Sequence, residues 1–161
     1  GDSCAIFGSR IANNNTALTL QYYKTSSGTS KYWRWCFGNN VNTVNHGGTI
    51  GDFHLSSISS ANTMVISGAG SYTATCSSSS FSNNFDIYVF GMNNGGEHGG
   101  KGALAHVQVN AFAIYNGSSL VRDYIPVRKN GVGYLYDKVS GQLFGNANST
   151  GSFSYGSDKT T

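Results

Sequence analysis

The sequence has few charges, a single proline and no long apolar run. Only 11% of its 161 residues are charged, against about 25% in ordinary soluble domains. The ten Lys and Arg residues are scattered, and the net charge is only +3. Since nucleic-acid-binding proteins usually carry a basic patch, we expect no nucleic-acid partner. No stretch approaches the ~20 apolar residues of a membrane helix, so we also expect no membrane span.

The polar surface must be built from Ser, Thr, Asn and Gly, in which the sequence is rich. Such surfaces are common in secreted and virion proteins, so we expect an extracellular location. The N-terminal residues Gly1 to Cys4 lack the basic start and apolar centre of a signal peptide. We therefore expect either a removed signal or another export route, such as virion assembly and lysis.

Cysteine is also scarce. Cys4, Cys36 and Cys76 are an odd number and cannot all pair within one chain. One disulfide with a remaining thiol and three thiols are both open interpretations. No CxxC spacing is present, which argues against a zinc site or a thioredoxin-like redox motif. The simplest prediction is that all three are small buried side chains on strands.

Helix signals are nearly absent, whereas short alternating runs of apolar and polar residues recur along the chain. Glycine-rich and Ser/Asn-rich turn clusters separate these runs, and 22 Gly against one Pro indicate many tight turns. This spacing predicts an all-β sandwich or barrel with about ten to twelve strands, in one domain over residues 1–161. The main predicted runs are Leu18–Tyr22, Trp33–Phe37, Phe53–Leu55, Thr63–Ser67, Tyr72–Cys76 and Phe85–Phe90.

A long strand is predicted from Leu104 to Tyr115. Its alternation changes phase midway, because Val107 and Val109 are odd-numbered whereas Phe112 and Ile114 are even-numbered. A β-bulge near Asn110-Ala111 would absorb the extra residue.

Turn chemistry is clearest after this strand. Asn130-Gly131 predicts a two-residue type I′ hairpin turn. Asp137 is predicted to accept backbone N–H bonds in a turn that ends at Gly141 in the left-handed conformation. Pro126 has no N–H, so it should end a ladder or lie on an edge. Arg122 and Asp123 are adjacent and should face opposite sides of a strand, so each is expected to pair elsewhere.

The segment over residues 104–153 reads I-Y-x-x-x-x-L-V-R-D-x-x-P from Ile114 and continues to Y-D-x-x-S-G from Tyr136. It resembles the C-terminal half of concanavalin A-like, LamG-like domains of phage tail and virion proteins and of gut-bacterial surface proteins. The segments Gly8-Ser9-Arg10 and Phe90-Gly91-Met92-Asn93 fit that family more loosely. The resemblance implies a two-sheet antiparallel jelly-roll sandwich. That family commonly has a further strand before its G-x-R segment, so we expect a first strand to be missing here or supplied by another chain.

Catalysis is not expected. Glycoside hydrolysis needs two carboxylates at a defined separation, and this chain has one glutamate, Glu97, and six scattered aspartates. No G-x-S-x-G elbow is present, and the four histidines show no triad context. We expect no cofactor, because the acidic residues, among them Asp52, Asp86, Asp123 and Asp137, are too dispersed to hold calcium.

Two segments are candidate binding sites. Residues 91–102 hold six glycines with Asn93, Asn94, Glu97 and His98 among them. They read as an adaptable polar loop over a sugar or as a plain flexible hairpin loop. In residues 32–37, Trp33, Trp35 and Phe37 are predicted in the core. The other face then carries Tyr32, which can stack on a sugar ring, and Arg34, which can meet an acidic sugar.

These features predict a lectin-like module that binds carbohydrate or a cell-surface receptor. It would belong to a phage tail, a virion or a secreted surface protein. The alternative is an assembly domain of a virion or fibre without a small ligand. Its partners would then be copies of itself or neighbouring chains.

Overall fold

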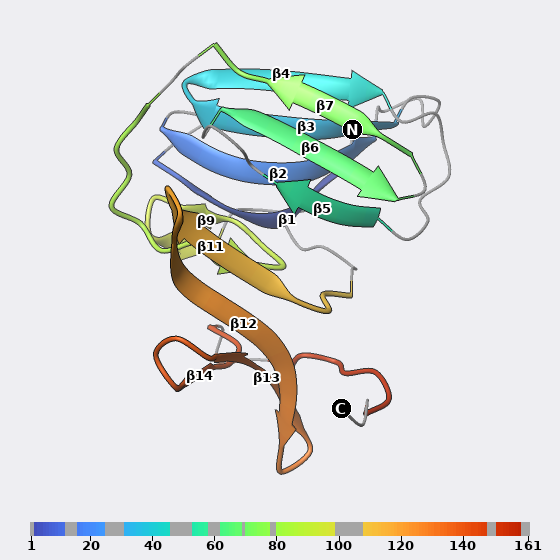
Figure 1. The fold of residues 1–161 in the computed structure, drawn as a ribbon, viewed down its shortest axis with the longest axis vertical. Coiled ribbons are helices and arrows are strands. Elements are labelled where there is room, and N and C mark those ends of the chain that lie inside the picture. The colour runs from blue at the N-terminus through green and yellow to red at the C-terminus, as the bar shows by residue number, and fades with distance from the viewer. Residues whose placement is uncertain are drawn as a thin grey trace. The chain divides into compact units, whose positions relative to one another are not determined.

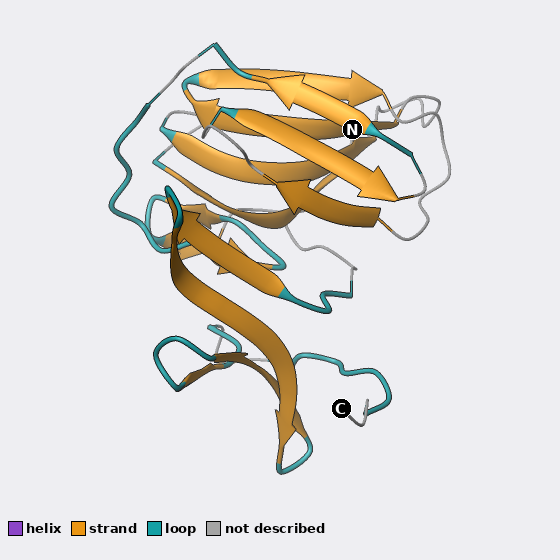
Figure 2. Ribbon diagram, viewed as in Figure 1, coloured by secondary structure: helices purple, strands orange, loops and turns teal. Residues whose placement is uncertain are grey.

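The computed structural model describes residues 2–11, 16–24, 31–45, 53–57, 62–68, 70–77, 80–98, 108–147 and 151–158. These residues form fourteen strands and no helix (Figure 2), which confirms the all-β prediction. The sequence predicted only ten to twelve strands. The difference arises because strands of two or three residues are too short to show an alternating pattern. The chain divides into two compact units, Gly1–Val107 and Gln108–Thr161, where one domain was expected.

The N-terminal unit contains a seven-stranded sheet. Its strands lie in the order β10-β9-β1-β2-β3-β4, and β8 also pairs with β1. Strands β1 to β4 lie side by side in chain order (Figure 1). All pairs are antiparallel except β1 with β9, which is parallel. The strands are β1 (Asp2–Arg10), β2 (Ala17–Lys24), β3 (Lys31–Gly38), β4 (Asn40–Asn45), β8 (Tyr88–Val89), β9 (Asn93–Asn94) and β10 (Glu97–His98).

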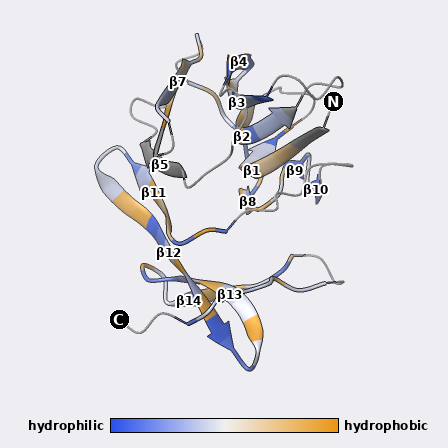
Figure 3. Cartoon of the chain, turned by 90° about the vertical axis from the view of Figure 1, so that its right-hand side faces the viewer, coloured by the Kyte–Doolittle hydropathy of each residue, from blue (hydrophilic) through white to orange (hydrophobic). Residues whose placement is uncertain are grey.

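A second, three-stranded antiparallel sheet has the order β5-β6-β7. It comprises β5 (Phe53–Ser57), β6 (Thr63–Gly68) and β7 (Tyr72–Thr75). Figure 3 shows β7 opposite β2 to β4, so the two sheets of this unit form two layers. Hydrogen bonds join the layers: Trp35 Nε1 donates to Asn62 O at 3.1 Å, and Asn42 Nδ2 donates to Thr75 O at 2.8 Å.

The core of the unit lies between these layers and follows the predicted alternation. Trp33, Trp35 and Phe37 of β3 are buried, as are Met64 and Ile66 of β6, which confirms both runs. Trp35 is 0% exposed and stacks on Phe37, with 6.2 Å between ring centroids. Burying such large apolar side chains is the main force holding the layers together.

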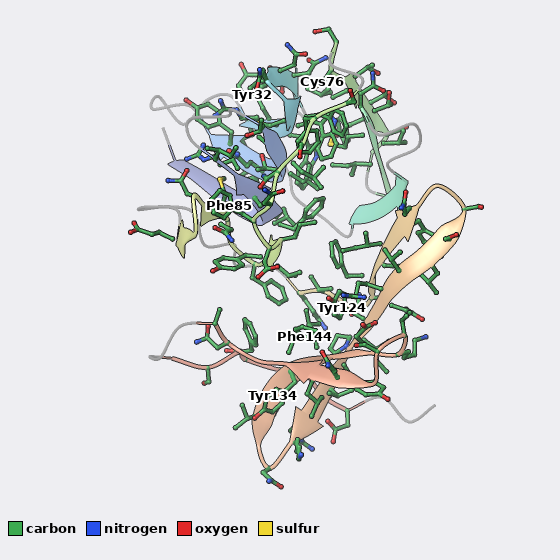
Figure 4. All side chains as sticks on the ribbon, turned by 90° about the vertical axis from the view of Figure 1, so that its left-hand side faces the viewer. Tyr32, Cys76, Phe85, Tyr124, Tyr134 and Phe144 are labelled. Atoms are coloured by element: carbon green, nitrogen blue, oxygen red, sulfur yellow. The ribbon has the colours of Figure 1, made fainter. Side chains whose placement is uncertain are left out.

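All three cysteines are thiols rather than disulfides. Cys36 and Cys76 are buried and Cys4 is half-buried, close to the prediction of small buried side chains, although Cys76 follows β7 and is not on a strand. Cys76 Sγ lies 3.7 Å from Trp35 O and 3.6 Å from Asn40 O, which places it against the larger sheet (Figure 4).

The C-terminal unit is an antiparallel sheet of order β11-β12-β13-β14. Asn130 and Gly131 join β12 to β13 with φ values of 52° and 77°. Both residues of a type I′ turn need positive φ, so the predicted hairpin is confirmed. The pairing of β11 with β12 ends at Tyr124. Pro126 lies beyond that point and pairs only with Leu135 of β13. The strands are β11 (Phe112–Asn116), β12 (Ser119–Lys129), β13 (Val132–Asp137) and β14 (Gln142–Phe144).

The turn after β13 is organised by the buried carboxylate of Asp137. Its Oδ1 accepts hydrogen bonds from Asp123 N at 2.9 Å and Val139 N at 3.1 Å. Its Oδ2 accepts from Ser140 Oγ at 2.7 Å and from Ser140 N at 3.3 Å. Gly141 has φ 72°, so the predicted turn is confirmed. Arg122 Nε lies 3.6 Å from Asp137 Oδ2, and Asp123 pairs with Lys138 at 2.5 Å, so each pairs elsewhere as predicted.

Aromatic contacts support this sheet. Tyr124 stacks on Phe112 with 6.2 Å between centroids, and Phe144 meets Tyr124 edge-on at 5.5 Å (Figure 4). Residues 151–158 lie along the hairpin, where Arg128 pairs with Asp158 and lies over the ring of Tyr155.

Two predicted strands were wrong in part. Residues 104–107 of the predicted long strand lie outside the described residues. Residues 108–111 do not pair with another strand, and β11 begins at Phe112. A register shift does occur, but between Ile114 and Tyr115. In the run Phe85–Phe90 only Tyr88–Val89 is a strand. Periodicity alone cannot tell whether an alternating run finds a neighbouring strand.

Candidate functional site

The outer face of the seven-stranded sheet, opposite the core, carries the most unusual group of side chains. In β3 the odd-numbered aromatic residues face the core, so Tyr32, Arg34 and Cys36 face outward. In β2, Leu20 faces the core, so Thr19, Gln21 and Tyr23 share the outer face. We call this group the polar face; its residues are Arg10, Thr19, Gln21, Tyr23, Tyr32, Arg34, Cys36 and Asn94.

The register aligns these residues in rows across the strands. Gly8, Thr19 and Cys36 form one row, and Ala5, Gln21 and Arg34 form the next. Tyr23 lies opposite Tyr32, with 6.3 Å between their ring centroids. A Cβ atom on Gly8 would lie 2.6 Å from Thr19 Cγ2 and 2.9 Å from Leu18 O, so glycine is required beside Thr19.

Several polar side chains on this face are buried, although they do not face the core. Thr19 is 0% exposed and Gln21 is 2% exposed, and Gln21 Nε2 donates to Thr19 Oγ1 at 3.0 Å. Cys36 is also buried. Burial of polar groups is costly unless they are hydrogen-bonded. Polar side chains on the outward face of a sheet usually stay in contact with water, so the burial of these side chains is unusual.

The two arginines of the polar face frame its centre. Arg10 Nε donates to Asn94 Oδ1 at 2.8 Å, which holds the guanidinium in place. Arg34 Nε is buried and has no hydrogen-bond partner among the described residues. Burial raises the pKa of the Cys36 thiol, although hydrogen bonds with Thr19 and Arg34 and the charges of Arg34 and Arg10 oppose the rise. Cys36 therefore stays a thiol at neutral pH, which does not suit a nucleophile.

The structure brings three of the predicted site residues to this face. Tyr32 and Arg34 lie on the outer side of β3, as predicted. Asn94 joins them because β9 pairs in parallel with β1, where Arg10 lies opposite Asn94. Glu97 is exposed on β10, opposite Asn94. His98 is in the same strand, and its side chain lies outside the described residues.

Asn93, another predicted site residue, is not part of the polar face. It is buried, its Nδ2 donates to Asp86 O at 3.0 Å and its Oδ1 accepts from Gly96 N at 2.8 Å. Both ends of the amide are thus used to shape the turn. The segment was expected to be an adaptable polar loop or a plain flexible hairpin loop, and residues 93–98 form a small hairpin, with Gly95 and Gly96 at φ 69° and 95°.

Sequence reasoning missed Arg10, Thr19 and Gln21. Thr19 and Gln21 alternate with Leu18, Leu20 and Tyr22, so the face that they share with Arg34 was open to prediction once β2 and β3 were paired. No local sequence pattern places Arg10 on this face, because its hydrogen-bond partner Asn94 is 84 residues away.

Comparisons with protein-family models, curated proteins and solved structures found no match to this chain. In the part of the chain that the structure describes, no three His, Cys, Asp or Glu side chains group as metal ligands. No helix within those residues is long and apolar enough to cross a membrane.

Proposed function

We propose that this protein is a lectin-like binding module that holds a glycan on the polar face of its N-terminal unit. One observation carries the proposal: hydrogen-bonding side chains are ordered and partly buried on a sheet face directed away from the core. Sugar hydroxyls both donate and accept hydrogen bonds, so they complement amides, hydroxyls and guanidinium groups. The flat rings of Tyr23 and Tyr32 add an apolar surface for a sugar ring.

The wider proposal follows from the fold and the sequence resemblance. The two layers of the N-terminal unit, antiparallel except for the pairing of β1 with β9, are compatible with a concanavalin A-like jelly roll, which we propose as the fold. We propose an extracellular protein of a phage tail, a virion or a cell surface, which recognises carbohydrate in adhesion and does not catalyse a reaction.

Replacing Tyr32 with alanine tests the glycan-binding proposal. We expect at least a ~10-fold loss of affinity for whichever glycan the full chain binds on a multivalent array, because the stacking surface is lost. The matched control is Tyr115→Ala, which removes a 60% exposed tyrosine of the C-terminal unit and should leave binding unchanged. Equal binding by Tyr32→Ala and the unaltered protein would place the glycan elsewhere.

A second candidate function, assembly without a small ligand, is favoured by the C-terminal unit. Seven of the nine large hydrophobic side chains that are exposed in the described residues belong to it: Tyr115, Leu120, Val132, Val139, Leu143, Phe144 and Tyr155. Exposed apolar groups gathered on one unit are typical of protein–protein contact surfaces.

On this second candidate, sedimentation of the full chain should give particles larger than the 17.0 kDa monomer. Leu143→Glu should shift the particles to monomers, because a charge cannot be buried unpaired in an apolar contact. Val41→Glu is the control, since Val41 is equally exposed but lies on β4 of the other unit. A monomer at all concentrations for the unaltered protein would rule out self-assembly.

A further inference from the structure

The polar face carries positive charge at its centre. Gly8, Thr19 and Cys36 form a row across β1, β2 and β3. Because β1 and β3 run in the same direction, Arg10 and Arg34 lie on opposite sides of this row. Each lies two residues away along its strand, which is about 7 Å. Both side chains are on the outer face, and both guanidinium charges act on the Cys36 thiol at the centre of the row.

The electrostatic environment of the pair favours an anion. Burial lowers the pKa of the Arg10 guanidinium; the Cys36 thiol opposes this shift and the charge of Arg34 adds to it. Within the described residues no carboxylate forms an ion pair with Arg34, whose Nε is buried without a hydrogen-bond partner. A buried charged donor left unsatisfied is costly, and an anion beside the Arg34 guanidinium group would offset part of that cost through its charge.

We propose that the polar face is specific for an anionic saccharide, whose carboxylate or sulfate group is held by Arg34 together with Arg10. This inference rests on the proposed glycan-binding function and names its ligand class. The negative group would lie over Thr19 and Cys36. The sugar ring would extend toward Tyr23 and Tyr32, which occupy the next outward-facing row beyond Gln21 and Arg34.

Two features of the face support this class of ligand over a neutral sugar. Arg10 is already oriented through its bond to Asn94, so little side-chain freedom is lost when a ligand binds. Glu97, the acidic residue nearest to this face along the β9–β10 pairing, is exposed at the sheet edge. There its charge is largely screened by solvent.

The test is calorimetric titration of the full chain with three probes. A hyaluronan hexasaccharide carries carboxylates, a carrageenan oligosaccharide carries sulfates, and a carboxyl-reduced hyaluronan hexasaccharide is neutral. We expect one or both anionic probes to bind at least ~10-fold more tightly than the neutral one. Binding of the hyaluronan probe would identify a carboxylate as the bound group, and binding of the carrageenan probe would identify a sulfate.

Variants assign the effect to the arginine pair. Arg34→Gln should lower affinity for the anionic probe by about 10-fold or more, and Arg34→Lys should restore only part of it, because lysine lacks the bidentate fork. The control Arg128→Gln removes the same charge from the other unit and should change affinity less than ~2-fold. Inorganic sulfate should also compete with the probe on the unaltered protein more strongly than chloride at equal ionic strength.

The outcomes separate this inference from the proposed function. Binding of the neutral probe to the unaltered protein as tightly as the anionic probes, or an unchanged affinity for the anionic probe in Arg34→Gln, would overturn the anion specificity and leave the glycan proposal standing. No binding to any probe or array glycan would overturn both. Equal losses in Arg34→Gln and Arg128→Gln would show general charge attraction in place of a site, and would also overturn the inference.

Discussion

Replacing Trp35 with alanine is expected to destabilise the N-terminal unit by about 3–5 kcal/mol, enough to leave much of it unfolded at 37 °C. Trp35 is fully buried, stacks on Phe37 and donates a hydrogen bond to Asn62 O in the chain leading into β6. Alanine removes that contact between the layers and leaves Asn62 O one donor short. The cost combines lost burial, a cavity and the loss of one of the two hydrogen bonds to Asn62 O, which still accepts one from Cys76 N.

The measurement is urea unfolding followed by far-ultraviolet circular dichroism. Tyr32→Ala is the matched control, because it removes an aromatic side chain from the same strand on the half-exposed outer face. It should cost about 1 kcal/mol or less. A Trp35→Ala variant with an unchanged unfolding midpoint would contradict the two-layer core.

Replacing Asp137 with alanine is expected to open the β13–β14 turn and the adjoining part of β12. The carboxylate accepts four hydrogen bonds from three residues, and alanine would leave Asp123 N, Val139 N and Ser140 N without that acceptor. We expect hydrogen exchange of residues 119–144 to accelerate by more than ~10-fold, while peptides of the N-terminal unit are unaffected. Asp158→Ala, which removes an exposed carboxylate of the same unit, is the control.

The same carboxylate predicts a pH dependence. Burial alone would raise the pKa of Asp137, but the hydrogen bonds from Asp123 N and from Ser140 and Val139 outweigh it and lower the pKa to about 2 from its usual 3.8. A carboxylate whose pKa is lowered on folding contributes stability above its unfolded pKa and loses that contribution as pH falls through the folded value. The protection of residues 119–144 should thus fall between about pH 4 and pH 2. Asp137→Ala should lack this step, and a step of equal size in the variant would assign it to another carboxylate.

Short-range patterns were the predictable part of this fold. The alternation Trp33-Arg34-Trp35 placed the core and its opposite face correctly, because a strand directs successive side chains to opposite sides. The turn at Asn130-Gly131 and the Asp137–Gly141 turn were also predictable, since their chemistry is local. By contrast, no local pattern shows that Asn93 is buried, because its environment is made by hydrogen bonds to Asp86 O and from Gly96 N.

The sequence by itself determined that the chain is all-β, which residues of β2 and β3 face the core, and that Tyr32 and Arg34 face outward. Only the tertiary structure decided that Arg10 and Asn94 join them on one polar face. The reason is physical: alternation and turn propensity act over a few residues, whereas the parallel pairing of β9 with β1 joins positions 84 residues apart. Such pairing depends on the packing of the whole unit, which no local pattern encodes.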